Sequence, residues 1–378
     1  MKMIEGYLLV VHTIVVPLAL LLMLALLPSK SYALSSSTRT SVTPFRIGTR
    51  PSNLALIQAK EVEVALLDAI KSTSTENDRE LQTKIVAIDV SGDKKEPIAS
   101  TQDAPLAMTA VDFTGSLDDA VIAGTIDAAV HSTKDLPPAN RWRDGLTIAC
   151  HIGPRADPCD VLVGSYSSFA ELPRGARVGS ASIRRQAQLL SHRPDVKVVN
   201  LRGNVQARLA ALENGDVDAL ILAAAGLDRL GSGNSHGRRI DMPKYHKVPV
   251  ENMLPGAAQG IVCVTCRADD NDALSLLHRI DNKEARIAAT AERALLDVVD
   301  KGLQHKWPGR PPVAAYMSRD DDGWVLRGLL ATPNGSKVVR TLQREKIDCS
   351  NEHASELGEL AGRDLLNEAG TTFLAGYG

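Results

Sequence analysis

The sequence predicts an α/β protein with two doubly wound domains and a small α+β domain at its C-terminus. From about residue 45 to residue 231, short apolar runs typical of strands alternate with amphipathic runs typical of helices. After about residue 320 the pattern changes to a hairpin followed by one long amphipathic helix. Alternation of the first kind favours parallel sheets, which bind ligands at the carboxyl ends of their strands.

The first half of this alternating region is expected to form strand–helix units. Ser52 has the side chain and the position to cap the first helix. The last strand of this half ends at the polar run Ser132-Thr-Lys-Asp. The expected strands cover residues 45–48, 84–90 and 127–131, and the expected helices cover residues 53–69 and 117–122.

The second half repeats the pattern and leads into the C-terminal domain. Val205, Leu209 and Leu212 recur at helical spacing, and Gly215 marks the end of that helix. Asn334-Gly335 is a hairpin turn signal between two apolar runs. The expected strands are 161–164, 177–179, 196–200, 218–222, 324–331 and 337–340, with helices over 183–191, 205–214, 226–230 and 352–368.

The composition is that of an ordinary globular protein. Apolar residues make up 44% of the 378 residues and charged residues 23%, whereas aromatic residues make up only 3%. The hydrophobic cores must therefore be built from aliphatic side chains. The formal net charge of −2 excludes a global positive field for nucleic acid or an anionic membrane, so local clusters must hold any bound polyanion.

The five cysteines do not predict a metal site. Cys263 and Cys266 form a CxxC pair, but no second pair and no histidine cluster accompanies it. We interpret these two residues as reduced thiols in a strand. The other three cysteines are Cys150, Cys159 and Cys349.

Residues 1–42 have the character of a targeting leader. An apolar stretch from Tyr7 to Leu27 precedes Ser31-Tyr-Ala, which favours a cleaved signal peptide over a membrane anchor. The following segment is hydroxylated, basic and free of acidic residues, as transit peptides are. Together they predict a bipartite signal-plus-transit address for a plastid (chloroplast), with secretion as the alternative.

Basic residues recur where predicted strands pass into helices. Arg50, the Arg184–Arg185 pair, Arg202 and Arg208 all lie at or just beyond such junctions. Helix N-termini favour anions, and arginine binds carboxylates through two hydrogen bonds. Any one of these arginines could be a solvated surface charge. As a group at equivalent junctions, they predict a pocket for a ligand with several carboxylates.

Asp135 is the candidate catalytic carboxylate. It lies at the end of a predicted strand in His131-Ser-Thr-Lys-Asp-Leu-Pro-Pro, a place where a carboxylate can stabilise a developing cation or accept a proton. A turn or capping role is the alternative, and the prolines that follow favour it.

Several segments resemble those of porphobilinogen deaminases, also called hydroxymethylbilane synthases. The resemblance runs in order from about residue 45 to the C-terminus. The matching segments are Arg46-Ile-Gly-Thr-Arg-Pro-Ser, His131-Ser-Thr-Lys-Asp-Leu-Pro, Val178-Gly-Ser-Ala-Ser-Ile-Arg-Arg, Asn200-Leu-Arg-Gly-Asn, residues 218–231, Ala258-Gln-Gly and Thr290-Ala-Glu-Arg-Ala.

The resemblance implies the fold of type II periplasmic binding proteins with a third domain added. The implied domains are 43–150 with 255–278, 151–254, and 283–378. Members of the family are transferases of tetrapyrrole biosynthesis, the route to haem and chlorophyll. They join four porphobilinogen units head to tail with loss of ammonia. The resemblance also implies a dipyrromethane cofactor and a monomer that binds neither nucleic acid nor, once the leader is removed, a membrane.

The resemblance also assigns roles to individual residues. It gives Asp135 contact with the pyrrole N–H groups and stabilisation of the methylene-pyrrole cation, with Lys134 as the basic residue beside it. The positions matching carboxylate-binding or neighbouring contacts are Arg50, Ser52, Ser180, Ser182, Arg184, Arg185, Arg202, Asn204, Arg208 and Gln259.

The sequence departs from the family pattern in three places. The family attaches its dipyrromethane to a cysteine, and the expected position holds Gly309. The segment from Pro105 to Phe113 is shorter than the family's flexible loop and lacks its lysine, and Thr133 stands where methionine is common. The first two changes indicate either lost selection for turnover or a misread exon near residue 305.

Several functions therefore compete. The leading hypothesis is a plastid porphobilinogen deaminase, because Asp135 and the paired arginines are intact. The second is a catalytically impaired paralogue that binds pyrrole polycarboxylates without a covalent primer, which Gly309 favours. A secreted solute-binding protein fits the leader but not the Ile183-Arg-Arg-Gln-Ala-Gln segment. Nucleic-acid binding fits least, since the arginines lack aromatic partners.

Overall fold

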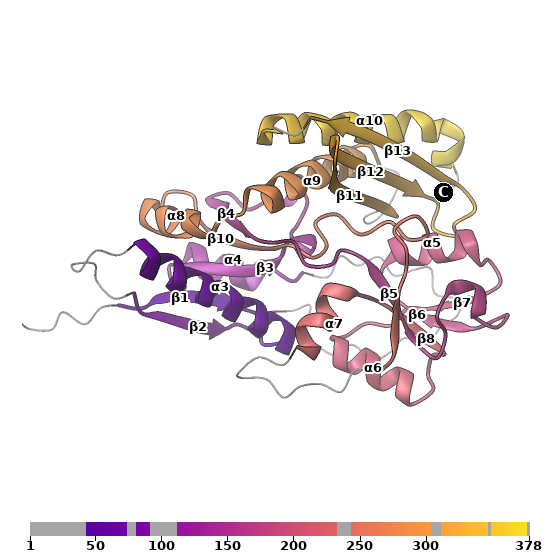
Figure 1. Ribbon diagram of the computed structural model, residues 1–378, viewed down its shortest axis with the longest axis horizontal. Coiled ribbons are helices and arrows are strands. Elements are labelled where there is room, and N and C mark those ends of the chain that lie inside the picture. The colour runs from indigo at the N-terminus through magenta and orange to yellow at the C-terminus, as the bar shows by residue number, and fades with distance from the viewer. Residues whose placement is uncertain are drawn as a thin grey trace, which may run out of the picture. The chain divides into compact units, whose positions relative to one another are not determined.

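The computed structural model describes residues 43–73, 81–90, 112–232, 243–303, 311–346 and 349–375 (Figure 1). Three predicted features fall outside these ranges: the leader, the segment with Gly309, and most of the segment from Pro105 to Phe113.

The N-terminal sheet has five strands in the order β2-β1-β3-β10-β4. Helix α3 (Asn53–Thr73) covers one face through Ala59, Val62 and Leu66, none of which is exposed. These residues recur at intervals of three and four, so they share one side of the helix. The strands are β1 (Phe45–Thr49), β2 (Thr83–Ala87), β3 (Ala128–Ser132), β4 (Leu146–Ile152) and β10 (Val262–Arg267).

The central sheet repeats this arrangement in the order β7-β6-β8-β5-β9. Apolar clusters lie on both of its faces, as expected for a sheet covered on two sides. Its strands are β5 (Asp160–Gly164), β6 (Arg177–Gly179), β7 (Lys197–Val199), β8 (Ala219–Ala223) and β9 (Tyr245–Lys247).

Both sheets are mixed, so the prediction of parallel sheets was wrong in part. The pairs β1–β2, β1–β3, β6–β7 and β6–β8 are parallel, whereas β10 and β5 pair antiparallel with both of their neighbours. The chain passes from one sheet to the other between β4 and β5 and returns between β9 and β10. A strand that enters a sheet from such a crossing needs no crossover helix and can pair antiparallel.

The C-terminal sheet is an antiparallel meander in the order β11-β12-β13, which confirms the predicted hairpin. Two helices, α9 (Lys283–Leu303) and α10 (Asn351–Ala375), lie together on one face of it (Figure 1). The strands are β11 (Val313–Asp320), β12 (Gly323–Ala331) and β13 (Val338–Glu345).

The remaining helices are short connections. None of the helices in the described ranges combines the length and apolar character needed to cross a membrane. Cys263 and Cys266 lie in β10 and are not disulfide-bonded, as expected of thiols in a strand. The remaining helices are α4 (Gly115–Ile122), α5 (Ile183–His192), α6 (Val205–Glu213), α7 (Ala224–Gly231) and α8 (Asn271–Leu277), with a 3₁₀ turn, η3, over Thr133–Asp135.

Candidate functional site

The predicted basic junctions come together at the carboxyl ends of parallel strands. In the N-terminal sheet, Arg50 follows β1, and Lys134 and Asp135 follow the neighbouring strand β3 within η3. In the central sheet, α5 begins shortly after β6 and carries Arg184 and Arg185 in its first turn. Lys134 lies near enough to both of these arginines for their like charges to repel one another, so the two sheets contribute to one site.

The paired arginines of α5 bind a buried aspartate that the sequence argument did not single out. The guanidinium groups of Arg184 and Arg185 each lie 2.8 Å from a carboxylate oxygen of Asp160, whose side chain is fully buried at the start of β5. Burial opposes ionisation of Asp160, but the two arginines and the hydrogen bonds from Arg185 and Gln259 outweigh it and hold its pKa at about 2. The two arginines add positive charge to the already positive N-terminal end of α5. Asp160 neutralises part of this charge from within the protein.

Gln259 joins this ion cluster to the N-terminal sheet. Its side-chain amide donates to the Asp160 carboxylate at 2.9 Å and to the Pro158 carbonyl at 2.7 Å. Its side-chain oxygen accepts from Lys134 and from Arg185, each at 3.4 Å. Burial, together with the charge of Arg185, lowers the pKa of Lys134 to about 8 against the opposing effect of Asp135. The ammonium of Lys134 therefore loses its proton as the pH rises through about 8.

Arg208 adds a further cation from α6. Its guanidinium donates to the Gly203 carbonyl at 2.9 Å, which turns it back toward the start of the helix. Burial and the charge of Arg185 lower its pKa to about 10, while Asp135 raises it. Arg208 is thus close enough to interact with both the arginine pair and the candidate catalytic carboxylate.

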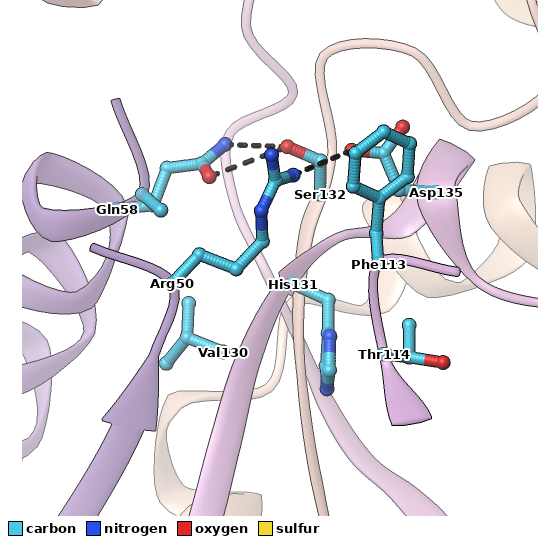
Figure 2. Close-up of a pocket in the computed structure, with 9 residues that line it drawn as sticks. Arg50, Gln58, Phe113, Thr114, Val130, His131, Ser132 and Asp135 are labelled. Atoms are coloured by element: carbon cyan, nitrogen blue, oxygen red, sulfur yellow. Dashed lines mark hydrogen bonds and ion pairs between the residues drawn. The ribbon is translucent and has the colours of Figure 1, made fainter. Parts of the chain in front are cut away.

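Asp135 and Arg50 line the same small pocket (Figure 2). The two side chains form an ion pair with 3.7 Å between nitrogen and oxygen. The guanidinium of Arg50 also lies 4.3 Å from the centre of the Phe113 ring, a cation–π contact, so the prediction that the arginines lack aromatic partners was wrong for Arg50. Burial and the charge of Arg50 lower the pKa of His131, in the same pocket, to about 4, so its imidazole is neutral at pH 7.

Within the described part of the chain, this site carries more positive than negative charge. Its cations outnumber its two carboxylates, Asp135 and Asp160. Lowered pKa values at Lys134 and Arg208 are the mark of cations that repel one another where water is scarce. A bound polyanion would relieve that repulsion. The five cations are Arg50, Lys134, Arg184, Arg185 and Arg208.

The other predicted contacts mostly begin helices. The Ser52 hydroxyl accepts from Ala55 N at 3.4 Å at the start of α3, and the Asn204 side chain accepts from Ala207 N at 2.9 Å at the start of α6. Ser182 is the first residue before α5, and the buried Ser180 hydroxyl accepts from Ser182 N at 3.2 Å. Arg202 is half-buried after β7. These caps orient helices whose N-termini face the cluster.

Phe113, Asp160 and Arg155 complete the surroundings of the cluster but were not predicted. Phe113 belongs to a segment compared with the family only by its length and its missing lysine, and no sequence pattern marks Asp160 at the start of an apolar strand. Arg155 binds the Glu292 carboxylate at 2.6 Å and the Gln259 carbonyl at 2.8 Å. These partners are far apart in the sequence, so only the folded chain reveals them.

The described thiols are not activated. Burial raises the pKa of Cys159 to about 12 and those of Cys263 and Cys266 to about 11. Burial likewise raises the pKa values of Cys150 and Cys349. A reactive cysteine needs a lowered pKa, so none of the five has the environment of a ready nucleophile.

The fold and the charges define a class: an α/β protein in which two mixed sheets carry a cation-rich site at the carboxyl ends of their strands, where such folds bind ligands. The chain belongs to the porphobilinogen deaminase family, because a family model described as "Porphobilinogen deaminase, dipyromethane cofactor binding domain" matches residues 45–275. The family resemblance of the sequence motifs is thereby confirmed.

Curated relatives extend the match over most of the chain. Porphobilinogen deaminase, chloroplastic, of Oryza sativa subsp. japonica is 39% identical over 90% of this chain and 88% of its own length. The chloroplastic enzyme of Pisum sativum is 37% identical over 91% and 87%, respectively. Porphobilinogen deaminase of Paracoccus denitrificans is 40% identical over 86% and 93%.

The resemblance to several solved periplasmic binding proteins is weak. The periplasmic aliphatic sulphonate binding protein SsuA from Escherichia coli aligns over 70% of this chain and 72% of its own, at 15% identity and a TM-score of 0.33. The fold assignment therefore rests on the sheets themselves and on the family match.

The cation cluster suits the family's cofactor. A dipyrromethane built from two porphobilinogen units carries several carboxylates, and the cluster has three more positive than negative side chains. Arg50, Arg184, Arg185 and Arg208 are the residues that would hold those carboxylates, with Lys134 beside them. The fit concerns binding, because the attachment position, Gly309, lies outside the described residues.

Proposed function

We propose that this chain is a hydroxymethylbilane synthase that joins four porphobilinogen units head to tail with release of ammonia. The observation that carries the proposal is the excess of cations over carboxylates, five against two, around Asp135, whose side chain is 29% exposed. Porphobilinogen and its oligomers are polycarboxylates that also develop positive charge at the reacting carbon. Cations at the site bind the carboxylates of the substrate, and Asp135 stabilises the positive charge at the reacting carbon.

The proposed chemistry assigns a separate task to each side of the site. The arginines bind the acetate and propionate groups and so fix where each pyrrole ring lies. Asp135 accepts a hydrogen bond from the pyrrole N–H and stabilises the cation formed when the aminomethyl C–N bond breaks. A C–C bond then forms between the methylene carbon of this cation and the free pyrrole carbon of the bound chain. That pyrrole carbon afterwards loses its proton. When bound, dipyrromethane supplies the free pyrrole carbon for the first addition.

Arg185→Ala is expected to weaken the binding of porphobilinogen by about tenfold to a hundredfold, because a buried charge-assisted contact is worth about 1.5–3 kcal/mol. Isothermal titration calorimetry measures the change. Arg177→Ala is the control, since Arg177 pairs with Asp218 at 2.6 Å at the amino end of β6 and β8, the end of the same sheet away from Arg185. Equal affinity of Arg185→Ala and the control would count against the carboxylate pocket.

Gly309 supports a second candidate, a paralogue that binds pyrrole polycarboxylates without turning them over. The raised pKa values of the described thiols favour it too, because they leave no activated cysteine to replace the missing one. The two candidates share the binding site and differ in whether porphobilinogen is consumed. Intact Asp135 and Lys134 support the enzyme.

We further propose a plastid location and a three-domain division of the chain. The chloroplastic relatives from rice and pea support the location, and the transit-like composition of residues 1–42 agrees with it. The three sheets support the division into 43–150 with 255–278, 151–254 and 283–378. The monomeric state is proposed from the family alone.

A further inference from the structure

The turn between β12 and β13 rests on the backbone of the helix that carries the arginine pair. Gly335, in this turn, has a φ of +69°, and a Cβ at this residue would lie 2.4 Å from the Ala187 carbonyl oxygen of α5. It would also lie 2.4 Å from the Ser191 amide nitrogen. Those two atoms are four residues apart on α5, the spacing of a helical hydrogen bond. The turn therefore packs against backbone atoms of α5, which cannot rotate out of the way as a flexible side chain can.

Hydrogen bonds within the turn keep it rigid. The buried Thr332 hydroxyl accepts from Lys337 N at 3.0 Å and donates to the Asn334 side-chain oxygen at 2.9 Å. The Gly335 amide donates to the Thr332 carbonyl at 2.8 Å. Because these hydrogen bonds fix the shape of the turn, a displacement of the turn also displaces the helix against which it packs.

Small apolar side chains continue the contact on either side. Ala187 of α5 packs in one buried cluster with Leu254 and with three residues of the C-terminal sheet. The cluster fills the space between that sheet and α5, one turn beyond the arginines. The residues from the sheet are Ala314, Leu329 and Ala331.

The same helix is fastened from a second direction by Leu254. The Leu254 carbonyl accepts from Arg184 at 2.6 Å and from the Gln188 side chain at 3.0 Å, and the Leu254 amide donates back to Gln188 at 2.7 Å. Leu254 and the Gly335 turn are thus two of the contacts that fix α5 along its axis, in addition to the bonds of Arg185 to Asp160 and to the Ile221 carbonyl. Because Arg184 and Arg185 lie in its first turn, any shift of α5 moves both guanidiniums.

We propose that Gly335 is a positioning residue for the Arg184–Arg185 pair, through which the C-terminal sheet holds α5 in register with the bound carboxylates. The inference rests on the proposed function of the arginine pair. It adds that carboxylate affinity depends on a residue that touches neither the ligand nor the arginines. Displacements of a few tenths of an ångström matter, because bidentate contacts require accurate placement.

The test compares Gly335→Ala with Gly370→Ala in the mature chain. Gly370, at the kink in α10, has a φ of +62° and a ψ of 178°, and a Cβ there meets nothing within 4 Å, so the control carries backbone strain of its own without the contact. Gly335→Ala is expected to weaken porphobilinogen binding about tenfold relative to Gly370→Ala. It is also expected to speed amide hydrogen exchange in α5 but not in α6, which a general loss of stability would not do.

Equal affinity and equal α5 exchange in the two variants would overturn the inference. If Gly335→Ala does not fold, Thr332→Val, which removes the hydroxyl that closes the turn, is the second variant, with the same expectation in smaller measure. Arg185→Ala run in parallel separates the two claims. Lost affinity in Arg185→Ala with none lost at Gly335 refutes the positioning role alone, whereas unchanged affinity in Arg185→Ala refutes the proposed pocket.

Discussion

Asp135→Ala is expected to lower the release of ammonia from porphobilinogen about a hundredfold to a thousandfold, because an electrostatic group aimed at a developing charge contributes that much. The folded state should change little. The Asp135 side chain is 29% exposed and its ion pair with Arg50 spans 3.7 Å, a contact that contributes weakly to stability. Turnover is followed by ammonia release, and folding by circular dichroism.

Asp218→Ala is the matched control for this experiment. Asp218 also pairs with an arginine and is 32% exposed, but it lies at the amino end of β8, the end of the central sheet away from the site. The control should keep its turnover. Turnover retained in Asp135→Ala would remove Asp135 from the mechanism, and a wild-type chain that binds porphobilinogen without releasing ammonia would favour the paralogue.

Arg155→Ala is expected to cost about 3–5 kcal/mol of folding free energy, because it leaves a buried carboxylate without its cation. Glu292 on α9 is fully buried and accepts from Arg155 at 2.6 and 3.1 Å. It also accepts from Met317 N of β11 at 2.6 Å and from Ala258 N at 2.5 Å. The pair therefore ties the C-terminal sheet and α9 to the segment that carries Gln259.

Chemical denaturation of Arg155→Ala and of Arg319→Ala measures this difference. Arg319 pairs with Glu284 at 2.8 Å, but both side chains are exposed, so its loss should cost less than about 1 kcal/mol. Adding Glu292→Leu to Arg155→Ala should restore part of the lost stability by removing the stranded charge. Similar costs for the two arginine variants would contradict the account of the buried pair.

The sequence predicted most of the elements because their signals are local. Strand and helix periodicity, the Ser52 cap and the Asn334-Gly335 turn depend on neighbours within a few residues, and each appears in the structure. Gly215 has the expected positive φ of +76° at the end of α6. The antiparallel pairing of β5 and β10 was missed, since strand direction depends on where the chain crosses between sheets.

The site was predictable in its cations but not in its internal partners. Arg50, Arg184 and Arg185 stand out because basic residues recur at equivalent junctions. Asp160 and Phe113 carry no such mark, and they meet the arginines only through tertiary structure. The sequence therefore predicted that the ligand is an anion. The structure revealed the groups that hold the arginines in place.

The central claim is that the arginine cluster holds a pyrrole polycarboxylate. Intact mass spectrometry of residues 43–378, purified with porphobilinogen available and sprayed under native conditions, tests it most directly. The account predicts a mass increase of two linked pyrrole units or more, lost in Arg185→Ala. Denaturing the same sample then tells whether a cysteine carries the adduct or the cluster alone holds it. A bare mass under native conditions would contradict the claim.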